Sequence, residues 1–408
     1  MTWITNNNEK GFVDLRKNAK ATLSALEFPT IKDEDWKYTR VAKLSKKSFS
    51  IENNNSVKSI VDAVYTNAIT RIVFENGFYR ANLSVNDSKY VKQISSLNDA
   101  ELTALLGKTG YVKQGIFTSY NDAFFTDGVV INIPAKEKIE SIIEIVFIST
   151  GKEQASIVKN IIIAGEESSA EVIMNFISHE TNDNLVNNSL HALIEKNAKL
   201  IVYKVQDELT GVSHFSSENA FQHNNSVFEM HTITLNGDLV RNDLNIKVDG
   251  TECHSHLGGV FVATGNMHVD NHTIVDHQQP NCTSDEIYKG IAADKSTGVF
   301  NGKIFVRRDA QKINAYQSSA NILLSDDASI YAKPELEIYA DDVKCSHGTT
   351  TGCIDEAALF YLRARGIGQE SAQKLLVHAF ANDVIEKIEN ENVQEWILAK
   401  LDAKLSEI

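Results

Sequence analysis

The sequence GDLVRNDLNIKV at 237–248 is followed by a second segment of the same design, GNMHVDNHTIV at 265–275. Two more come after it, TGVFNGKIFVR at 297–307 and ASIYAKPELEIY at 328–339. Each consists of a turn, a short strand, a polar corner and another strand, and each begins about 30 residues after the one before it. Self-similarity at a fixed interval is typical of a repeat architecture in which each unit stacks on the one before it.

The segments between these repeats begin at 249, 281, 310 and 341, and so recur at a similar interval. Apolar and β-branched residues alternate with polar ones over about 129–352, as in half-buried strands. Two half-turns in each period of about 30 residues predict a mainly β fold, a right-handed parallel β-helix. An antiparallel sandwich, the alternative, would not give so steady a period. The segment 199–236 fits poorly, and we expect an insertion or an altered coil there.

The residues before this strand-rich core show both helical and strand-like patterns. Apolar residues recur at spacings of three and four over 8–27, which predicts an amphipathic helix, and a short helix is predicted at 99–106. Asn76-Gly77 is a strong turn signal and predicts a hairpin. Trp36 and Tyr38 lie in a short polar segment, and we expect them to clamp the N-terminal region onto the body of the protein.

Three helical patterns follow the core, at 355–365, 369–388 and 393–405. The first begins with acids and ends with arginines, which matches the helix dipole, and Gly366 is predicted as its C-cap. We expect these helices to cap the open end of the β-helix or to dock a partner. The predicted domains are an N-terminal helical and mixed region at 1–128, a β-helix core at 129–352 and a C-terminal helical domain at 353–408.

The composition narrows the range of partners and compartments. The chain has 54 acidic and 40 basic residues, a net charge of −14, whereas a protein whose main partner is nucleic acid needs a basic surface. No apolar run approaches the roughly 20 residues that span a bilayer, and MTWITNNNEKGF at the N-terminus is not a signal peptide. We therefore expect a cytoplasmic protein that contacts neither nucleic acid nor membrane. Its four cysteines are then expected to be thiols.

Enzyme signatures find little support in the sequence. Gly107-Lys108-Thr109 resembles the end of a phosphate-binding loop, but Leu102 occupies the place of the first glycine. Many parallel β-helices act on polysaccharides through acidic residues and an arginine, so a lyase or hydrolase is the main enzyme alternative. Asp341-Asp342 and Arg307-Arg308-Asp309 offer such groups, but turn acids and solvated charges are the favoured explanation for them.

Cys345 and His347 stand out because they come at the end of the strand pattern, shortly before the first C-terminal helix. Alternation along a strand points both side chains to the same face. Thiolate and imidazole are ligands for iron and zinc, which makes the pair a candidate metal-binding site. The alternative is one inward cysteine and one hydrogen-bonded histidine.

The repeat predicts what lies beneath this pair. Coils about 30 residues apart place equivalent positions one strand spacing from each other. Cys345 and His347 are therefore expected to lie near Ala315 and Gln317, respectively. One coil further down, we expect Glu286 and Tyr288 at the equivalent positions.

A second group of candidates is rich in histidine. Alternation puts His254 and His256 on one face of a strand and Cys253 on the other. Histidines concentrated in this way either bind a metal or serve as polar fillers of strand surfaces, and the sequence leaves both open. The group consists of Cys253, His254, His256, His268, His272 and His277.

Two stretches resemble a known family. They are YADDVKCSHGTTTG at 339–352 with DEAALFYLRARGI at 355–367, and PTIKDEDWKYT at 29–39. They resemble the SufB/SufD superfamily of iron–sulfur cluster assembly, and the SufD family within it more than the SufB family. The layout of the whole chain is similar too, with an N-terminal helical region, a β-helix core and C-terminal helices. No cysteine precedes Cys253, whereas SufB has cysteines in its N-terminal half.

This resemblance implies a non-catalytic scaffold subunit that pairs with SufB through the β-helix and holds the ATPase SufC with the C-terminal helices. Cys345 and His347 would lie at the SufB interface, with His347 as a ligand or proton carrier for a transient iron–sulfur cluster and no stably bound cofactor. SufC dimerisation on ATP would pull the helices and open that interface. The isolated chain could form a homodimer. The residues implied in SufC docking are Tyr361, Arg363, Arg365 and Gly366.

Overall fold

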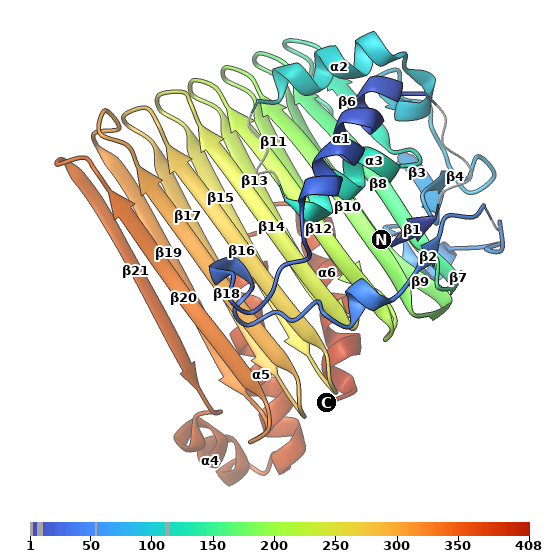
Figure 1. Cartoon of the computed structure of the whole chain (residues 1–408). Coiled ribbons are helices and arrows are strands. Elements are labelled where there is room, and N and C mark those ends of the chain that lie inside the picture. Colours follow the sequence, from blue (N-terminus) through green and yellow to red (C-terminus); the bar gives the residue numbers. More distant parts are fainter. Residues whose placement is uncertain (1–2, 6–10, 54, 111–114) are drawn as a thin grey trace.

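The computed structural model describes residues 3–5, 11–53, 55–110 and 115–408. Its centre is a β-solenoid of about 8 turns, in which a nine-stranded sheet faces a ten-stranded sheet (Figure 1). From β7 onward, successive strands of the chain alternate between the two sheets, and each pairs in parallel with a strand of the coil before it. The predicted parallel β-helix with flanking helical regions is therefore confirmed.

The order of strands in each large sheet follows the coils from the C-terminal end of the solenoid to its N-terminal end. The nine-stranded sheet consists of β20 (Ser329–Ile338), β18 (Thr297–Val306), β16 (His268–His277), β14 (Leu239–Val248), β12 (Val212–Gln222), β10 (Asn184–Ile194), β8 (Ala155–Ala164), β6 (Val129–Ile133) and β5 (Val91–Gln93). The ten-stranded sheet consists of β21 (Val343–Gly352), β19 (Ile313–Leu323), β17 (Thr283–Ala292), β15 (His254–Ala263), β13 (Val227–Asn236), β11 (Lys199–Asp207), β9 (Ser169–Asn182), β7 (Ile143–Lys152), β3 (Thr70–Glu75) and β4 (Phe78–Tyr79). A small separate sheet pairs β1 (Ile4–Thr5) with β2 (Phe49–Ser50).

Helices flank the solenoid at both ends of the sequence. The predicted helix at 8–27 is observed as α1, although residues 6–10 lie outside the described part of the chain. The predicted short helix at 99–106 is confirmed as α2, and the three C-terminal helices are confirmed with slightly different bounds. The helices are α1 (Val13–Ala25), α2 (Asp99–Lys108), α3 (Ile116–Phe124), α4 (Glu356–Ala364), α5 (Gln369–Ile385) and α6 (Glu391–Ser406). No helix in the described ranges is both long and apolar enough to cross a membrane.

The coils differ slightly in length. Ser213 pairs with Leu239 across one of the shorter coils, whereas Thr297 pairs with Ser329 across a longer one. Of the two alternatives expected at 199–236, the insertion is wrong, because β11, β12 and β13 continue the solenoid, and the altered coil is confirmed. The irregularity there is a register shift between Gln206 and Asp207. A fixed period misses this region because its coils are shorter.

The interior of the solenoid is mostly aliphatic but contains a ladder of polar side chains. Asn160 Nδ2 donates to Asn188 Oδ1 (2.8 Å) one coil later, and Asn188 Nδ2 donates to Ser216 Oγ (2.9 Å). Lys204 and Glu218 form a fully enclosed ion pair at 2.7 Å. Buried polar groups of this kind are tolerated because their partners replace water.

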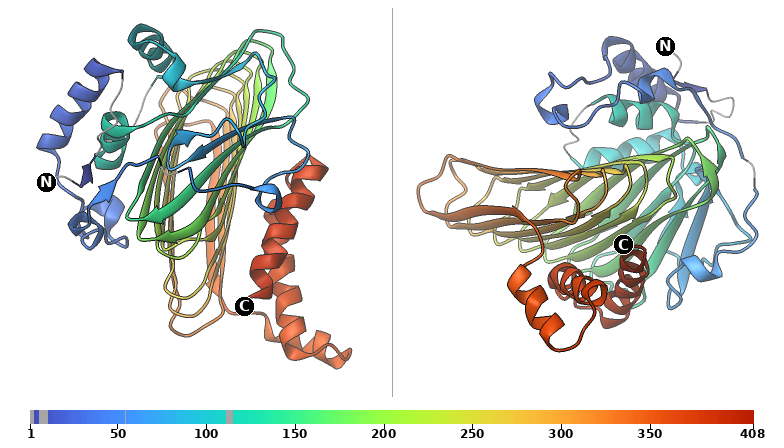
Figure 2. Two further views of the ribbon diagram at one scale, coloured as in Figure 1. Left: turned by 90° about the vertical axis from the view of Figure 1, so that its right-hand side faces the viewer. Right: turned by 90° about the horizontal axis from the view of Figure 1, so that it is seen from below.

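The N-terminal region covers the outer face of the nine-stranded sheet (Figure 2). Trp36 stacks on Phe117, and the Arg241 guanidinium of β14 lies 3.8 Å from the centre of the Trp36 ring. Tyr38 stacks on Tyr331 of β20, with ring centres 4.3 Å apart. These contacts confirm the predicted clamp. The hairpin is confirmed as well, since β3 and β4 pair antiparallel around Asn76-Gly77, both with positive φ.

The C-terminal helices lie along the outer face of the ten-stranded sheet, on the side opposite the N-terminal region (Figure 2). Val377 and Ile385 of α5 and Ile397 of α6 pack on an apolar stripe that includes Ile201 and Ile233. The expectation that these helices cap the open end of the β-helix is therefore wrong. Both faces of these strands are apolar, so the outer stripe attracts the helices and the last coil stays uncovered.

Candidate functional site

The last coil of the solenoid ends in two free strand edges. β20 and β21 are the outermost strands of their sheets, and in the described part of the chain neither has a neighbour on its outer side (Figure 1). Most residues of β21 are exposed. A long strand with unpaired backbone N–H and C=O groups is a ready template for pairing with another chain. This end is therefore a candidate interface.

Cys345 and His347 both lie on β21, at this edge. Both belong to its inward-facing alternation, in register with Ala315 and Gln317 of the interior. Cys345 is half-buried and packs against the interior core, and burial raises the pKa of its thiol. His347 is exposed. The strand thus presents a sheltered thiol and an accessible imidazole two residues apart.

The expected neighbours of this pair are confirmed for one coil. Cys345 is in register with Ala315, and His347 is in register with Gln317. The prediction for the coil below is wrong by two residues, because Gln317 pairs with Glu286 and not with Tyr288. The coil that joins Glu286 to Gln317 is longer than the prediction assumed.

Below His347 lie two buried polar residues that the sequence did not mark as functional. Gln317 Nε2 donates to Glu286 Oε2 at 2.6 Å. Burial raises the pKa of Glu286 to about 7. The signal that could have revealed them is the interruption of an apolar column by a carboxyl and an amide.

The candidate docking residues lie on and just after α4, which follows β21 after three residues. This helix has no buried residue, and Phe360 and Tyr361 are 73% and 57% exposed. Arg365 donates to the Tyr361 hydroxyl at 3.0 Å, while Arg363 is exposed in the last turn. Gly366 has a φ of 89°, the left-handed conformation that ends a helix, so the predicted C-cap glycine is confirmed in the position after Arg365.

A cavity of about 530 Å³ adjoins this helix. It lies where the end of β19 meets α4, α5 and the C-terminal residues of the chain. Leu359 and Val377 contribute apolar lining, while Glu356 and Lys374 contribute charges, and Cys353 is exposed at its rim. This cavity and the exposed aromatic residues of α4 leave apolar surface at the end of the helical region that is not packed against the rest of the chain.

The histidine group does not form one site. His254 and His256 lie on the outer face of the ten-stranded sheet, His268 and His272 lie on β16 of the other sheet, and His277 is enclosed in the interior, 3.0 Å from Ser284 Oγ. Within the described residues, no group of three or more His, Cys, Asp or Glu side chains is arranged to hold a metal ion. Sequence proximity failed here because consecutive strands belong to opposite sheets.

Two of these histidines belong to the N-terminal clamp. Asp270 lies 2.9 Å from His272 and 2.7 Å from Arg241, and it accepts a hydrogen bond from Thr39. Burial alone would raise the pKa of Asp270, but His272 and Arg241 hold it below its ordinary value. His268 lies 2.9 Å from the same Thr39 hydroxyl. These contacts give the two histidines a structural role.

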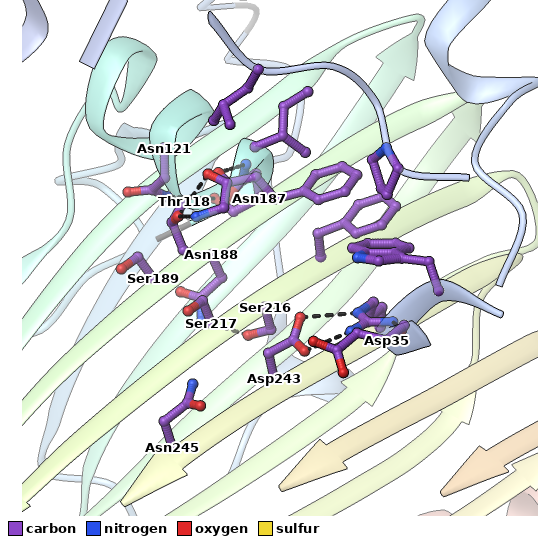
Figure 3. Close-up of a pocket in the computed structure, with 18 of the residues that line it drawn as sticks. Asp35, Thr118, Asn121, Asn187, Asn188, Ser189, Ser216, Ser217, Asp243 and Asn245 are labelled. Atoms are coloured by element: carbon purple, nitrogen blue, oxygen red, sulfur yellow. Dashed lines mark hydrogen bonds and ion pairs between the residues drawn. The ribbon is translucent and has the colours of Figure 1, made fainter. Parts of the chain in front are cut away.

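A pocket of about 210 Å³ lies beside the clamp, between α3 and the outer face of the nine-stranded sheet (Figure 3). Asn187, Ser217 and Asn245 contribute polar side chains from three strands of that sheet. Asp243 is tied to Arg241 by two hydrogen bonds of 3.0 and 2.9 Å. No sequence pattern pointed to this pocket, because its residues come together only through the solenoid.

Cys253 and Cys282 face the interior on adjacent coils and are buried. The Cys253 N–H donates to Cys282 Sγ at 3.4 Å, and Cys282 Sγ donates to the Gly250 carbonyl at 3.1 Å. A hydrogen bond with Cys282 lowers the pKa of the Cys253 thiol. The two cysteines therefore interact with each other by hydrogen bonding inside the corner of the coil. They lie far along the chain from Cys345.

The residues weighed for polysaccharide chemistry lie in turns. Arg307 is bonded to Asp276 at 2.7 Å, and Arg308 and Asp309 are exposed beside it. Asp341 and Asp342 are exposed in the turn before β21, where the Lys312 N–H donates to the Asp342 carbonyl at 2.6 Å. Turn formation accounts for these groups.

Residues 147–380 match the family model described as "SUF system FeS cluster assembly, SufBD core domain", and residues 1–145 match "SufBD protein N-terminal region". The chain belongs to the SufB/SufD family. Membership confirms the resemblance and gives the chain a role in iron–sulfur cluster assembly, the function in the family's own description.

Several curated proteins are similar over most of the chain. The iron-sulfur cluster assembly protein SufD of Escherichia coli (strain K12) is 27% identical over 382 residues, which cover 92% of this chain and 89% of that protein. Protein ABCI7, chloroplastic, of Arabidopsis thaliana is 28% identical, covering 93% of this chain and 83% of that protein. SufD of Bacillus subtilis (strain 168) is 25% identical, covering 72% and 69%.

Proposed function

We propose that the chain is a non-catalytic scaffold subunit that pairs with a SufB-type partner through β20 and β21 and docks the ATPase SufC with its C-terminal helices. The single observation that carries the proposal is the position of Cys345 and His347 on a free strand edge. In a complex, this edge becomes the line along which two chains meet. A nascent iron–sulfur cluster is then the cargo held between them.

The chemistry of the two side chains supports this role. A thiolate and an imidazole are both iron ligands, and two donors are fewer than the four that a cluster usually takes. The remaining ligands would come from the partner across the strand edge. His347 is exposed and available as a ligand or proton carrier, while Cys345 is half-buried until the interface forms. Without a partner, the same edge could pair with a second copy of the chain.

The connection from β21 to α4 supports transmission of motion. Three residues separate the strand from the helix, and Asp355 caps the helix by accepting from Ala357 N (2.8 Å) and Ala358 N (3.3 Å). Because so short a link cannot absorb much displacement, ATP-driven movement of SufC on the helices would move β21. That movement would open the partner interface to iron and sulfide.

The main test uses the complex purified with SufB and SufC. His347→Ala is expected to leave folding and complex formation intact and to abolish cluster assembly, measured by visible absorbance and iron content. Ser346→Ala is the matched control, since Ser346 is exposed on the opposite face of the same strand. A normal cluster yield from His347→Ala would contradict the role of His347.

The docking part of the proposal has a separate test. Arg363→Glu with Arg365→Glu is expected to weaken co-purification with SufC while SufB stays bound. Arg308→Glu with Lys312→Glu reverses two exposed charges at a corner between β18 and β19 and serves as the control. Unchanged SufC recovery with the α4 variant would rule out this docking surface.

A further inference from the structure

The inward-facing column that ends at His347 changes character along the solenoid. It begins with the buried hydroxyl residue Thr70, its next five members are apolar and buried, and its last three are a carboxylic acid, an amide and an imidazole. Parallel register places each side chain about 4.8 Å from its equivalent in the previous coil. The column consists of Thr70, Ile143, Val172, Val202, Met230, Leu257, Glu286, Gln317 and His347.

Access to water does not explain the two polar members before His347. Glu286 is 1% exposed and Gln317 is 3% exposed, so both lie as deep as the apolar residues before them. Burying a carboxyl and an amide is unfavourable unless each finds a partner. Their mutual hydrogen bond of 2.6 Å satisfies one atom of each. Leucine at both positions would continue the apolar column without this cost.

The hydrogen bond to Glu286 fixes the orientation of the Gln317 amide. Since Nε2 donates to the carboxyl group, Oε1 is the free end of the amide. Gln317 Oε1 is buried and has no hydrogen-bond partner among the described residues. The next side chain in the column is His347, whose ring carries an N–H.

Gly302 on β18 provides the space for this amide from across the interior. A Cβ at position 302 would lie 2.2 Å from Nε2 and 2.8 Å from Cδ of Gln317. Such distances are far inside van der Waals contact, so any side chain at this position would displace the amide. The opposite sheet is therefore shaped around Gln317.

We propose that Gln317, held by Glu286 and accommodated by Gly302, is a positioning residue whose Oε1, unpaired in this structure, accepts one ring N–H of His347 when the imidazole turns toward the interior. A hydrogen bond at one ring nitrogen leaves the lone pair on the other, which is the atom able to bind iron or accept a proton. The column thus selects the tautomer that His347 presents at the strand edge. The importance of His347 rests on the proposed function, whereas the hydrogen bond does not.

The test is the neutral tautomer of His347 in the full chain, read by proton–nitrogen NMR after labelling of the histidine rings. His347 signals are assigned by their loss in His347→Ala. Gln317→Ala is expected to shift the ratio of the two neutral tautomers by about fivefold, which corresponds to about 1 kcal/mol for one hydrogen bond. An unchanged ratio would overturn the proposal.

Two further variants keep the test valid if Gln317→Ala folds poorly. Glu286→Gln lets the Gln317 amide turn over, and Gly302→Ala pushes the amide aside while both polar residues remain. Both are expected to shift the tautomer ratio in the same direction. Ser319→Ala is the control, because Ser319 is buried on the same strand but is in register with Thr349. A shift in the control as large as in Gln317→Ala would also overturn the proposal.

Cluster assembly with SufB and SufC separates the two hypotheses. A shifted tautomer with slower assembly in Gln317→Ala supports both. A shifted tautomer in Gln317→Ala, together with normal assembly in His347→Ala, supports the hydrogen bond and contradicts the proposed function. An unchanged tautomer, together with loss of assembly in His347→Ala, overturns the positioning role and leaves the proposed function standing.

Discussion

At its N-terminal end the solenoid is closed by its own chain, whereas at its C-terminal end two strands are left with a bare edge. β5 pairs antiparallel with β6, and the β3–β4 hairpin closes the other sheet. Nothing comparable covers β20 and β21 in the described part of the chain. Proteins ordinarily protect strand edges. Because this chain covers the strands at one end of the solenoid and leaves those at the other end unpaired, the unpaired edge indicates a surface that binds another chain.

The two bare strands also differ from each other. β20 contains Pro334, which lacks an N–H, and its Lys333 and Glu335 form an ion pair at 3.3 Å. These are features that discourage strand pairing. β21 has no proline and consists largely of small polar residues around Cys345 and His347. The edge with the candidate ligands is therefore the one better suited to accept a partner strand.

The largest expected effect tests the N-terminal region that covers the outer face of the nine-stranded sheet. Trp3 is enclosed by Phe28, Phe49, Phe117 and Tyr120, and its Nε1 donates to the Leu44 carbonyl at 3.1 Å. Trp3→Ala leaves a large cavity and is expected to lower the free energy of unfolding by about 4 kcal/mol. Urea denaturation followed by circular dichroism measures this. A loss below about 1 kcal/mol would mean that this cover contributes little to stability.

The next effect concerns a carboxyl buried near the open end. The pKa of Glu286 is raised from 4.5 in the unfolded chain to about 7 in the folded protein, so its contribution to stability is complete below pH 4.5 and is lost as pH rises through 7. Glu286→Gln does not titrate. Its free energy of unfolding relative to the wild type is expected to increase by about 3 kcal/mol between pH 4 and pH 8. Denaturation at a series of pH values checks this.

The control for that experiment is Glu140→Gln, because Glu140 is exposed. Its stability is expected to follow the wild type at every pH. Parallel curves for Glu286→Gln and the wild type would show that Glu286 ionises in the folded protein as readily as in the unfolded chain. The raised pKa of Glu286 would then no longer support the contrast between a sealed interior and an open last coil.

The smallest expected effect is the difference in unfolding free energy between substitutions at two consecutive members of one inward-facing column. Ile304 is fully buried, and Leu336, its partner in register, is only partly buried on β20. Ile304→Ala is expected to cost about 3 kcal/mol of unfolding free energy, and Leu336→Ala about 1 kcal/mol because part of its side chain already contacts water. Pairing with SufB is expected to increase the second value. Equal costs in the isolated chain would indicate that the last coil is already covered.

The fold was predictable because its period is written into the sequence. The position of Cys345 over Ala315 followed from the period, since the last coil has the average length. The step below it failed because the coil from Glu286 to Gln317 is slightly longer, and a side-chain column depends on the residue count of every turn. A period gives the architecture, whereas the exact turn lengths give the contacts.

The covering elements were harder to predict. The clamp joins Trp36 to Phe117 and Arg241, residues with no periodic relation to one another. The C-terminal helices were expected at the open end, but they pack on the outer face of strands such as β11, which are apolar on both faces. Ile201 faces the helices and Val202 faces the interior, and hydrophobicity alone does not distinguish the two. The placement follows from burial of the outer stripe, which is a property of the assembled sheet.

The parallel register also means that the length of the solenoid increases in fixed steps of one coil. Each added coil extends the body by about 4.8 Å, the spacing between paired strands, and leaves both ends chemically unchanged. The distance between the N-terminal cover and the strand edge with His347 is therefore set in whole coils. Insertion or loss of one coil of about 30 residues would shift this edge relative to anything held by the N-terminal region, while a shorter insertion would only enlarge a turn.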